Sequence, residues 1–533
     1  MKSSLKKAVT ALLAAALLAA TPCTSVFGAQ TYYVNDGSST LTMADAYAIG
    51  ASGEAAKLPD RGVYAATANG TQMLGGTEYD DVQPNVPNGL IRAGLAFGST
   101  ALDAVHLQIK TGSGFAFGYY DEEAGRVFRA VGSTAENSVA VVADTNVTVG
   151  SSTFGAYHIE LDDTYTDFEA AQAAAAAHGG YPVFYNGTYR VRIGSFETAD
   201  AASASSAAAS GSVVSGGSRG VLVVKAGTDE ILFGFDCGST KSLTLAPQNS
   251  SGAAITQVAE CKYRSTDHSC TYNGDFQFTR FDTQQPQKLT LVNFVDLESY
   301  VKGVVPYEMS SGWPIEALKA QAVCARTYAA SHMNGLPAYG FDITATTTSQ
   351  VYLGTVESSA NSDRAVDETA GKFVRYQGKL CETFFFAADG GATENSENVW
   401  VAEVPYLRGV IDPYEKDIDF YCKSWGTSVS RDAVGDISVT YTPIGNVMTV
   451  TVGGKTYSKD NVRTFLTKIC GLRYNSRHFT VEYDAASNVY NVVGGGYGHN
   501  CGMSQWGAKA MAQEHGKTYE EIISFYYTGA YVS

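Results

Sequence analysis

The chain has 533 residues, a formal net charge of −16 and a pI near 5.0. This acidity argues against a nucleic-acid partner, because phosphates are bound through a basic face. The length allows roughly two to four domains with cores of their own. With 55 glycines and 33 tyrosines but only 13 prolines, we expect a folded, β-rich protein of the α+β class.

The first 28 residues have the pattern of a secretory signal peptide. Lys2, Lys6 and Lys7 form the charged start, and residues 9–20 are apolar and rich in Leu and Ala. This run is too short for a membrane-spanning helix, and no later stretch reaches the ~18 unbroken apolar residues that such a helix needs. We therefore predict an exported, extracytoplasmic protein.

Nine cysteines occur, and Cys23 would leave with the signal peptide. The remaining cysteines are even in number and in an oxidising location, so the sequence is compatible with disulfides. Cys261 and Cys270 are the only close pair, and no CxxC spacing occurs. The connectivity stays open at this point.

Residues 29–153 are expected to form an N-terminal β-rich region. Runs such as 90–97, 105–109 and 138–143 are typical of strands, and Gly, Asn and Asp separate them. No catalytic constellation occurs among these residues. We interpret the region as a scaffold.

Residues 154–225 predict a different module. A strand at 157–161 precedes an Ala-rich helix at 166–177, and a hairpin follows around Asn186-Gly187. A second small-residue helix, 197–209, precedes a strand at 220–225. This β-α-β-β-α-β order, with Tyr-Arg-Val-Arg-Ile-Gly-Ser-Phe at its centre, resembles a SPOR (sporulation-related repeat) domain.

The SPOR resemblance implies a ferredoxin-like module that binds peptidoglycan glycan stripped of its stem peptides. Two other interpretations stay open. The segment can be a packing module without a ligand, and the Ser/Gly-rich stretch 210–218 can be a flexible linker.

The stretch 297–309 delivers one carboxylate, Glu308, just before a predicted helix at 315–330 that Pro314 opens. Lys319 and Arg326 share one face of that helix. A lone Glu beside two cations is a candidate acid/base centre. The alternative is a surface carboxylate with two solvated cations.

The C-terminal block 493–506 is rich in glycine but lacks the Lys-Ser/Thr of a phosphate loop. Its glycines permit unusual backbone angles, so that His499, Ser504 and Gln505 can line a cleft. A structural histidine is the alternative for His499. The last helix is expected to start at Thr518, with Glu521 completing a capping box.

Two blocks carry a further resemblance. Residues 298–309, Glu-Ser-Tyr-Val-Lys-Gly-Val-Val-Pro-Tyr-Glu-Met, with 318–329 after them, resemble the signature of the stage II sporulation protein D family (SpoIID/LytB domain). Residues 496–508, Gly-Tyr-Gly-His-Asn-Cys-Gly-Met-Ser-Gln-Trp-Gly-Ala, are similar to its second motif. We therefore expect a SpoIID-type catalytic domain over 226–533.

The family resemblance implies a lytic transglycosylase that cleaves peptidoglycan glycan strands, preferably peptide-stripped ones, to 1,6-anhydro-muramyl products. Glu308 is then the catalytic acid/base, and no second carboxylate is needed to activate water. The residues implied to bind the substrate are Lys319, Gln321, Arg326, Tyr406, Glu415, His499, Ser504 and Gln505. Tyr406 can also be a plain core aromatic residue.

The chain departs from the family pattern at several positions. Relatives have Asn where Asp389 stands and often Asp in place of Glu415. They usually have Gly and Val where Asn500 and Cys501 stand. Cys501 and Cys324 each lie beside a signature residue, and we expect a disulfide between them.

Some relatives carry zinc ligands in the stretch that aligns with 342–352. Thr344, Thr348 and Ser349 occupy those positions here, and hydroxyls are poor zinc ligands. We therefore predict no metal and no cofactor.

The resemblance also implies a wall-associated location, in wall remodelling or sporulation. A cell-wall amidase or a sporulation membrane-protein complex is an expected partner. Because some LytB-type relatives modify a partner amidase, a non-catalytic peptidoglycan-binding role is the main alternative. A serine hydrolase is disfavoured, since Ser504 lies in Met-Ser-Gln and not in Gly-x-Ser-x-Gly.

Overall fold

The structure is a computed structural model, and it describes residues 80–109, 112–248, 252–255, 269–281 and 287–533, with the backbone of six short strands between Tyr33 and Met73. The predicted signal peptide lies outside the described residues. The chain divides into two compact units. Unit 1 comprises Met1–Gln83, Gly312–Ser331 and Ala365–Ser533, and unit 2 comprises Pro84–Ser311 and His332–Arg364. Among the described residues, no helix is long and apolar enough to cross a membrane.

Unit 2 contains a seven-stranded sheet, which includes the strand expected at 90–97. In β24 (Thr290–Asp296) every residue but the last is buried, as in a strand covered on both faces. It pairs antiparallel with β7 (Leu90–Ala96). The sheet order is β10 (Val127–Thr134), β9 (Phe115–Asp121), β20 (Leu243–Pro247), β23 (Asp275–Thr279), β24, β7 and β25 (Ile343–Thr344).

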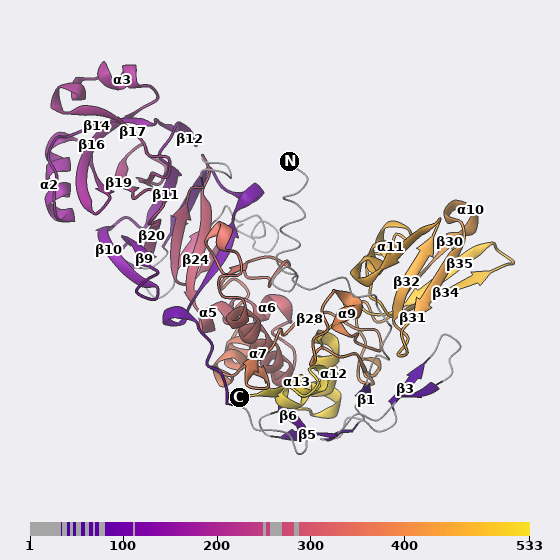
Figure 1. Ribbon diagram of the computed structural model, residues 1–533. Helices are drawn as coiled ribbons and strands as arrows, with labels where there is room; N and C mark the ends of the chain where they lie inside the picture. Colours follow the sequence, from indigo (N-terminus) through magenta and orange to yellow (C-terminus); the bar gives the residue numbers. More distant parts are fainter. Residues whose placement is uncertain are drawn as a thin grey trace, which may run out of the picture. The chain divides into compact units, whose positions relative to one another are not determined.

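The second sheet of unit 2 has ten strands. Its order is β17 (Ser212–Ser215), β14 (Tyr157–Glu160), β16 (Thr188–Phe196), β15 (Tyr181–Tyr185), β19 (Ile231–Asp236), β18 (Val221–Lys225), β11 (Ser138–Ala143), β8 (Ala104–Gln108), β21 (Ala253–Ile255) and β22 (Cys270–Tyr272). Helix α2 (Phe168–His178) packs on β15 and β16 (Figure 1). The strands predicted at 105–109 and 138–143 are confirmed.

The segment 154–225 keeps the expected element order, with one change. Asn186 and Gly187 form the predicted hairpin turn, with φ of 47° and 96°. The strand that pairs with β14 at the edge is β17, from the stretch that was considered as a linker. The strand predicted at 220–225 is β18, and it lies between β19 and β11. The order β17-β14-β16-β15 thus forms one end of the larger sheet.

The helix expected at 197–209 is shorter than predicted. The α-helical part, α3, spans only Ala199–Ser203, and a 3-10 helix follows at Ser206–Ser210. Ser203 Oγ donates to the Ala199 carbonyl and Ser205 Oγ to the Ala202 carbonyl. Such local serine bonds compete with the helical backbone pattern, which explains the early end.

A buried ion cluster fixes the start of the segment 342–352 in unit 2. The Asp342 carboxylate accepts from Arg92 Nη2 at 2.8 Å and from both terminal nitrogens of Arg126 at 2.9 Å. The Asn334 amide donates to it as well. Burial opposes the charge, but the two arginines outweigh it and lower the pKa of Asp342.

Three helices form the centre of unit 1. Helix α7 (Ile315–Ser331) starts directly after Pro314, as predicted, and lies beside α12 (Gln505–His515) and α13 (Tyr519–Tyr526) (Figure 1). Thr518 and Glu521 form the expected capping box. The buried face of α13 includes Ile522, Ile523 and Phe525.

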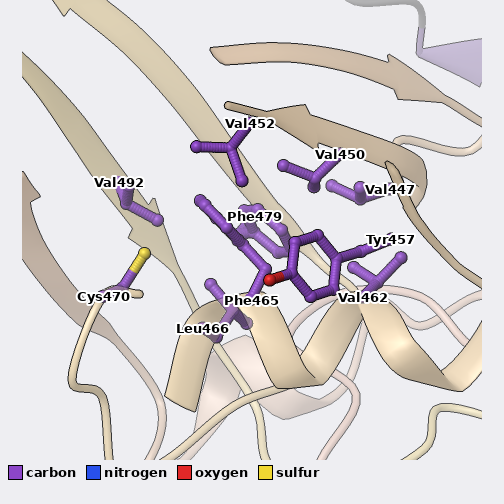
Figure 2. Close-up of a cluster of buried hydrophobic side chains, with 10 residues drawn as sticks. All are labelled: Val447, Val450, Val452, Tyr457, Val462, Phe465, Leu466, Cys470, Phe479 and Val492. Carbon is purple, nitrogen blue, oxygen red and sulfur yellow. The ribbon is translucent and has the colours of Figure 1, made fainter. Parts of the chain in front are cut away.

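Unit 1 also contains a six-stranded sheet, in the order β2 (Thr40–Thr42), β5 (Val63–Thr67), β6 (Gly70–Met73), β37 (Tyr531–Val532), β26 (Val374–Tyr376) and β27 (Lys379–Leu380). Two three-stranded sheets are β30 (Trp425–Ser430), β35 (Val489–Gly494) and β34 (Phe479–Asp484), and β31 (Ile437–Tyr441), β32 (Val447–Val452) and β33 (Lys455–Ser458). Helix α11 (Val462–Lys468) packs on the second of these. Figure 2 shows their shared core, in which Phe465 and Phe479 stack at 6.3 Å.

The expected disulfide between Cys324 and Cys501 is wrong, because both are free, buried thiols. Cys324 is hydrogen-bonded to Tyr527, whereas Cys501 lies near the charges of Arg408 and Glu394. Cys270 is disulfide-bonded. The other thiols that the structure gives as free and buried are Cys237, Cys381, Cys422 and Cys470.

Candidate functional site

Glu308 belongs to unit 2, at the end of a short helix. Two helices, α5 (Leu297–Lys302) and α6 (Val305–Glu308), meet at Gly303, where an added Cβ would lie 2.4 Å from the Tyr352 ring. Val304 and Val305 are fully buried. Glu308 itself is partly exposed and is the last residue of α6.

A backbone amide orients the Glu308 carboxylate. The Val351 N–H donates to Glu308 Oε1 at 3.0 Å. Both neighbours of Val351 are fixed by buried hydroxyls: Tyr300 Oη donates to Gln350 Oε1 at 3.1 Å, and Tyr352 Oη donates to Asn293 Oδ1 at 2.7 Å. The carboxylate is therefore held through β24 of the unit's sheet.

Tyr352→Phe tests this support. We expect the free energy of unfolding of unit 2 to fall by about 1–3 kcal/mol, because the buried Asn293 oxygen loses its donor. Tyr483→Phe, at an exposed tyrosine in unit 1, is the control. Chemical denaturation followed by circular dichroism measures the loss, and equal stability of wild type and Tyr352→Phe would contradict this role.

In the stretch that aligns with a zinc site in some relatives, the side-chain hydroxyls hydrogen-bond to one another. Thr344 Oγ1 donates to Ser349 Oγ at 3.0 Å and lies 3.4 Å from Thr346 Oγ1. The absence of zinc at this place stays a prediction.

The other eight predicted site residues belong to unit 1, three of them on α7. Lys319 Nζ lies 2.9 Å from Glu316 Oε1 and 2.8 Å from Glu368 Oε2. Desolvation opposes its charge, but these partners outweigh it and raise the pKa of Lys319. Arg326 is fully buried, and its guanidinium donates to the carbonyls of Val366 and Lys372. Lys319 is partly exposed, whereas the hydrogen bonds of Arg326 are made to the backbone within unit 1.

Gln321, Ser504 and Gln505 meet where α7 faces the start of α12. Gln505 Nε2 donates to Gln321 Oε1 at 3.3 Å, and both residues are buried. Ser504 is the N-cap of α12, since its Oγ accepts from the Gly507 N–H at 3.0 Å. The Met-Ser-Gln motif therefore links two helices of unit 1.

His499 and Tyr406 are partly exposed and held by backbone groups. His499 Nδ1 accepts from the Cys501 N–H, so its Nε2 carries the proton and donates to the Phe385 carbonyl at 3.1 Å. Burial lowers the pKa of His499 to about 4, so the ring is neutral at pH 7. The Tyr406 hydroxyl accepts from the Glu382 N–H at 2.8 Å.

Glu415 lies in a buried cluster of three carboxylates with Asp389 and Asp412. One oxygen from each lies within 4.8 Å of the others. Glu415 accepts from Ser504 Oγ at 2.5 Å and from the Asp389 N–H at 2.8 Å, and Tyr526 Oη donates to Asp412 at 2.7 Å. Asp389 Oδ2 is buried and has no hydrogen-bond partner among the described residues.

Burial raises the pKa of all three carboxyls, and repulsion by the neighbouring carboxylates adds to it for Asp389 and Glu415. That of Asp389 lies well above its usual value, that of Asp412 is raised, and that of Glu415 is raised to about 7. The folded chain therefore keeps protons on this cluster that the unfolded chain releases. For Glu415, the stability that results is complete below pH 4.5 and is lost as the pH rises through about 7.

Asp389→Asn should weaken this pH dependence. The variant carries no acid at this position, so its stability should fall less between pH 5 and pH 8 than that of wild type. His478 and His499, whose pKa values are lowered to about 4, act in the opposite sense below pH 6.5 in both proteins. Tryptophan fluorescence in urea at each pH suits the test, since all four tryptophans belong to unit 1.

Asp419→Asn is the matched control for that series, because this carboxylate is 99% exposed. It should follow the wild-type curve at every pH. Parallel curves for Asp389→Asn and wild type would show that the cluster does not titrate in this range.

A small pocket lies beside the carboxylate cluster in unit 1. Its volume is about 230 Å³, and it is lined by Gly390, Lys423, Gly445, His478, Phe479, Thr480, Val493, Gly494 and Gly495. The Gly390 N–H donates to Glu415 Oε2 at 2.9 Å, so the pocket wall and the carboxylates share one loop.

Sequence reasoning missed Asp389, Asp412 and Val351. Asp389 was noted only as a departure from Asn, and a backbone donor such as Val351 leaves no signal in its side chain. Asn500 also gains an explanation. It has φ of +63°, where Gly fits best and Asn is tolerated, and its side chain donates to the Asp389 and Ala392 carbonyls.

Comparisons with known proteins point to one family. The Stage II sporulation protein (SpoIID) family profile matches residues 285–376, which include Glu308, Lys319 and Arg326. An uncharacterized protein of Brachyspira hyodysenteriae is 35% identical over 314 residues, 54% of this chain and 82% of its own length. Stage II sporulation protein D of Bacillus subtilis is 34% identical over 270 residues, 45% of this chain and 76% of its own.

The chain therefore belongs to the SpoIID family of cell-wall and sporulation proteins. A further relative is the amidase enhancer of Bacillus subtilis, which is 31% identical over 288 residues. That alignment covers 43% of this chain and 39% of the relative. The mixed α+β class is confirmed by the sheets and helices of both units.

Proposed function

We propose that the protein is a secreted, wall-associated lytic transglycosylase that cleaves the glycan strands of peptidoglycan, with Glu308 as its acid/base. The observation that carries the proposal is the setting of Glu308. Glu308 is partly exposed, is the last residue of α6, and has its carboxylate oriented by the Val351 amide. A fixed carboxyl group is the one reactive group that this reaction requires.

The reaction needs no water and no second carboxylate. Glu308 donates its proton to the glycosidic oxygen as the bond from that oxygen to the muramyl C1 breaks. The 6-hydroxyl oxygen of the same sugar then bonds to C1, and its proton passes to the Glu308 carboxylate. The products are a 1,6-anhydro-muramyl end and a free 4-hydroxyl, and the acid is restored.

The eight site residues of unit 1 are proposed to bind the glycan in two ways. Lys319 and Tyr406 are partly exposed and suited to contact sugar hydroxyls, acetamides or stem carboxylates. His499 is also partly exposed, but backbone groups occupy both its ring nitrogens, so it is proposed to offer only its ring face. The buried ones are proposed to hold the surface from within, and these are Gln321, Arg326, Glu415, Ser504 and Gln505.

The segment 154–225 is proposed to be a SPOR-like module that selects glycan stripped of stem peptides. The strand order β17-β14-β16-β15, with α2 and α3 as connections, supports this proposal, because it is the order of a ferredoxin-like module. A preference for peptide-stripped glycan over intact peptidoglycan should then depend on this segment.

The decisive experiment is digestion of purified, peptide-stripped peptidoglycan, with products identified by mass spectrometry. Wild type should release anhydro-muramyl ends, and Glu308→Gln should not. Reducing ends without the anhydro ring would mean hydrolysis and would refute the proposed chemistry. Intact peptidoglycan, digested in parallel, measures the preference for stripped strands.

The amidase-enhancer relative favours a second candidate, a non-catalytic modifier of a partner amidase. In that case neither wild type nor Glu308→Gln cleaves glycan. Both would instead raise the rate at which a cell-wall amidase releases stem peptides. Adding such an amidase to the digestion separates the two functions.

A further inference from the structure

A continuous row of aromatic side chains, here called the aromatic belt, lies in unit 1 and takes no part in the chemistry above. Its members are Trp313, Phe420, Tyr421, Tyr474, Tyr497 and Trp506. None of them is buried, and Tyr421 and Tyr497 are 55% and 36% exposed. Elsewhere in the unit, rings such as Phe465 and Phe479 are core residues.

The rings of the belt touch one another in sequence. The centroids of Trp313 and Trp506 are 4.6 Å apart, and Tyr421 follows Trp506 at 6.1 Å. Tyr474 lies 5.0 Å from Tyr421, and Tyr497 lies 5.6 Å from Tyr474. Phe420 stacks on Trp506 at 4.9 Å with an interplanar angle of 15°. The belt is therefore a strip several rings long.

Backbone bonds hold the loops of the belt in place without a ligand. The Gly496 N–H donates to the Cys422 carbonyl at 2.8 Å, and the Gly498 N–H donates to the Asn475 carbonyl at 2.9 Å. Tyr497 exchanges two backbone bonds with Ala388. A Cβ at Gly496 would lie 2.6 Å from the Ala388 oxygen, so only glycine lets this turn present Tyr497.

Two cations lie over the belt. Lys509 Nζ is 4.5 Å from the centroid of Trp506 and 5.2 Å from that of Trp313, and the Arg473 guanidinium is 5.3 Å from Tyr474. Among the described residues, neither cation is within ion-pair distance of a carboxylate. In a chain of net charge −16, two cations on a row of rings favour an anionic ligand with apolar faces.

We propose that the aromatic belt binds a glycan strand that carries carboxylates, and that it is the glycan-holding platform of unit 1. The C–H faces of successive pyranose rings stack on the aromatic faces, whose electron density attracts them. Lys509 and Arg473 pair with the carboxylates of the muramyl lactyl groups. Rigid aromatic side chains lose little conformational entropy on binding, which suits a repeating ligand. The inference rests on the proposed function for its choice of glycan but does not depend on cleavage.

The test measures binding in Glu308→Gln full-length protein, so that no strand is cut. The probes are peptide-stripped peptidoglycan glycan, which carries lactyl carboxylates, and a chito-oligosaccharide of similar length, which carries none. Tyr421→Ala with Tyr474→Ala should lower the affinity for both probes by about tenfold or more, as loss of two stacking contacts implies. Lys509→Gln should lower only the affinity for the carboxylated glycan.

Tyr483→Ala is the matched control, since this tyrosine is 43% exposed on β34 outside the belt, and it should bind as the parent does. Quenching of tryptophan fluorescence on glycan addition, expected through Trp313 and Trp506, gives an independent readout. If the double variant unfolds at a lower urea concentration than wild type, the single variant Tyr421→Ser is used in its place. Unchanged binding by folded belt variants would overturn the proposal.

The outcomes keep the two proposals apart. If binding depends on the aromatic belt but wild type does not cleave glycan, the proposed transglycosylase activity is refuted and the proposed glycan binding by the belt is supported. If wild type and the belt variants bind and cleave glycan equally well, the proposed role of the aromatic belt is refuted and the proposed transglycosylase activity is supported.

Discussion

Glu308→Gln should slow glycan cleavage by about two to four orders of magnitude, the usual contribution of a general acid. The amide is nearly isosteric, and its oxygen can still accept from the Val351 N–H that holds Glu308 at 3.0 Å. The variant should therefore fold and bind glycan as wild type does. Only the proton that the leaving oxygen requires is missing. The initial rate of anhydro-muramyl release, read by mass spectrometry, measures the effect.

Glu357→Gln is the control for this experiment. Glu357 lies in the same unit as Glu308 but on an exposed loop. Its substitution should leave the rate unchanged. If Glu308→Gln instead cleaved at the wild-type rate, the acid would have to be sought elsewhere in the chain.

Asp342→Asn should destabilise unit 2 by about 3–5 kcal/mol, because it leaves buried cations without their counter-charge. The Arg92 and Arg126 side chains that pair with Asp342 are only 10% and 1% exposed. The pKa of Asp342 is lowered, so its contribution to the stability of wild type is complete above pH 3.8 and is lost gradually as the pH falls below that value. The difference in stability between wild type and Asp342→Asn should therefore shrink in acid. Circular dichroism in urea at pH 7 checks the first effect.

Asp121→Asn provides the comparison, because the Asp121–Arg129 pair is largely exposed. Its side chains are 32% and 50% exposed, so its removal should cost less than about 1 kcal/mol. Equal losses for the two variants would mean that the Asp342 cluster contributes no more than a surface pair. Tryptophan fluorescence should show unit 1 folded in both, since every tryptophan lies there.

Local signals in the sequence predicted the elements that depend on few neighbours. Pro314 at the start of α7, the Thr518–Glu521 capping box and the Asn186-Gly187 turn each depend on residues within one or two turns of chain. All the residues that form these helix starts and this turn are close together in the sequence, and the three predictions were confirmed.

Features made by distant pairing were less predictable. β14 pairs with β16 on one side and with β17 on the other, and such pairing depends on the packing of the whole sheet and not on the order of strands along the chain. Arg326 was expected to bind substrate, but it is buried, and carbonyl groups 40 and 46 residues away accept its hydrogen bonds. The Asp389, Asp412 and Glu415 carboxyls come together only through the loops around them.

The division of the chain has a consequence for how the protein folds. The chain passes between the units after Gln83, Ser311, Ser331 and Arg364, so unit 1 is assembled from three separated stretches. Strand β37 lies between β6 and β26, and Tyr531 pairs with Gly70 across more than 450 residues. During synthesis, unit 2 has all its residues once Arg364 has emerged, whereas the sheet of unit 1 must wait for Tyr531. The entropic cost of closing a loop grows only slowly with its length, so the pairing is not prevented by so long a separation. The stabilising contacts between β37 and β6 nevertheless form late, because the loop must close first. The part that carries the aromatic belt is therefore the last to become native.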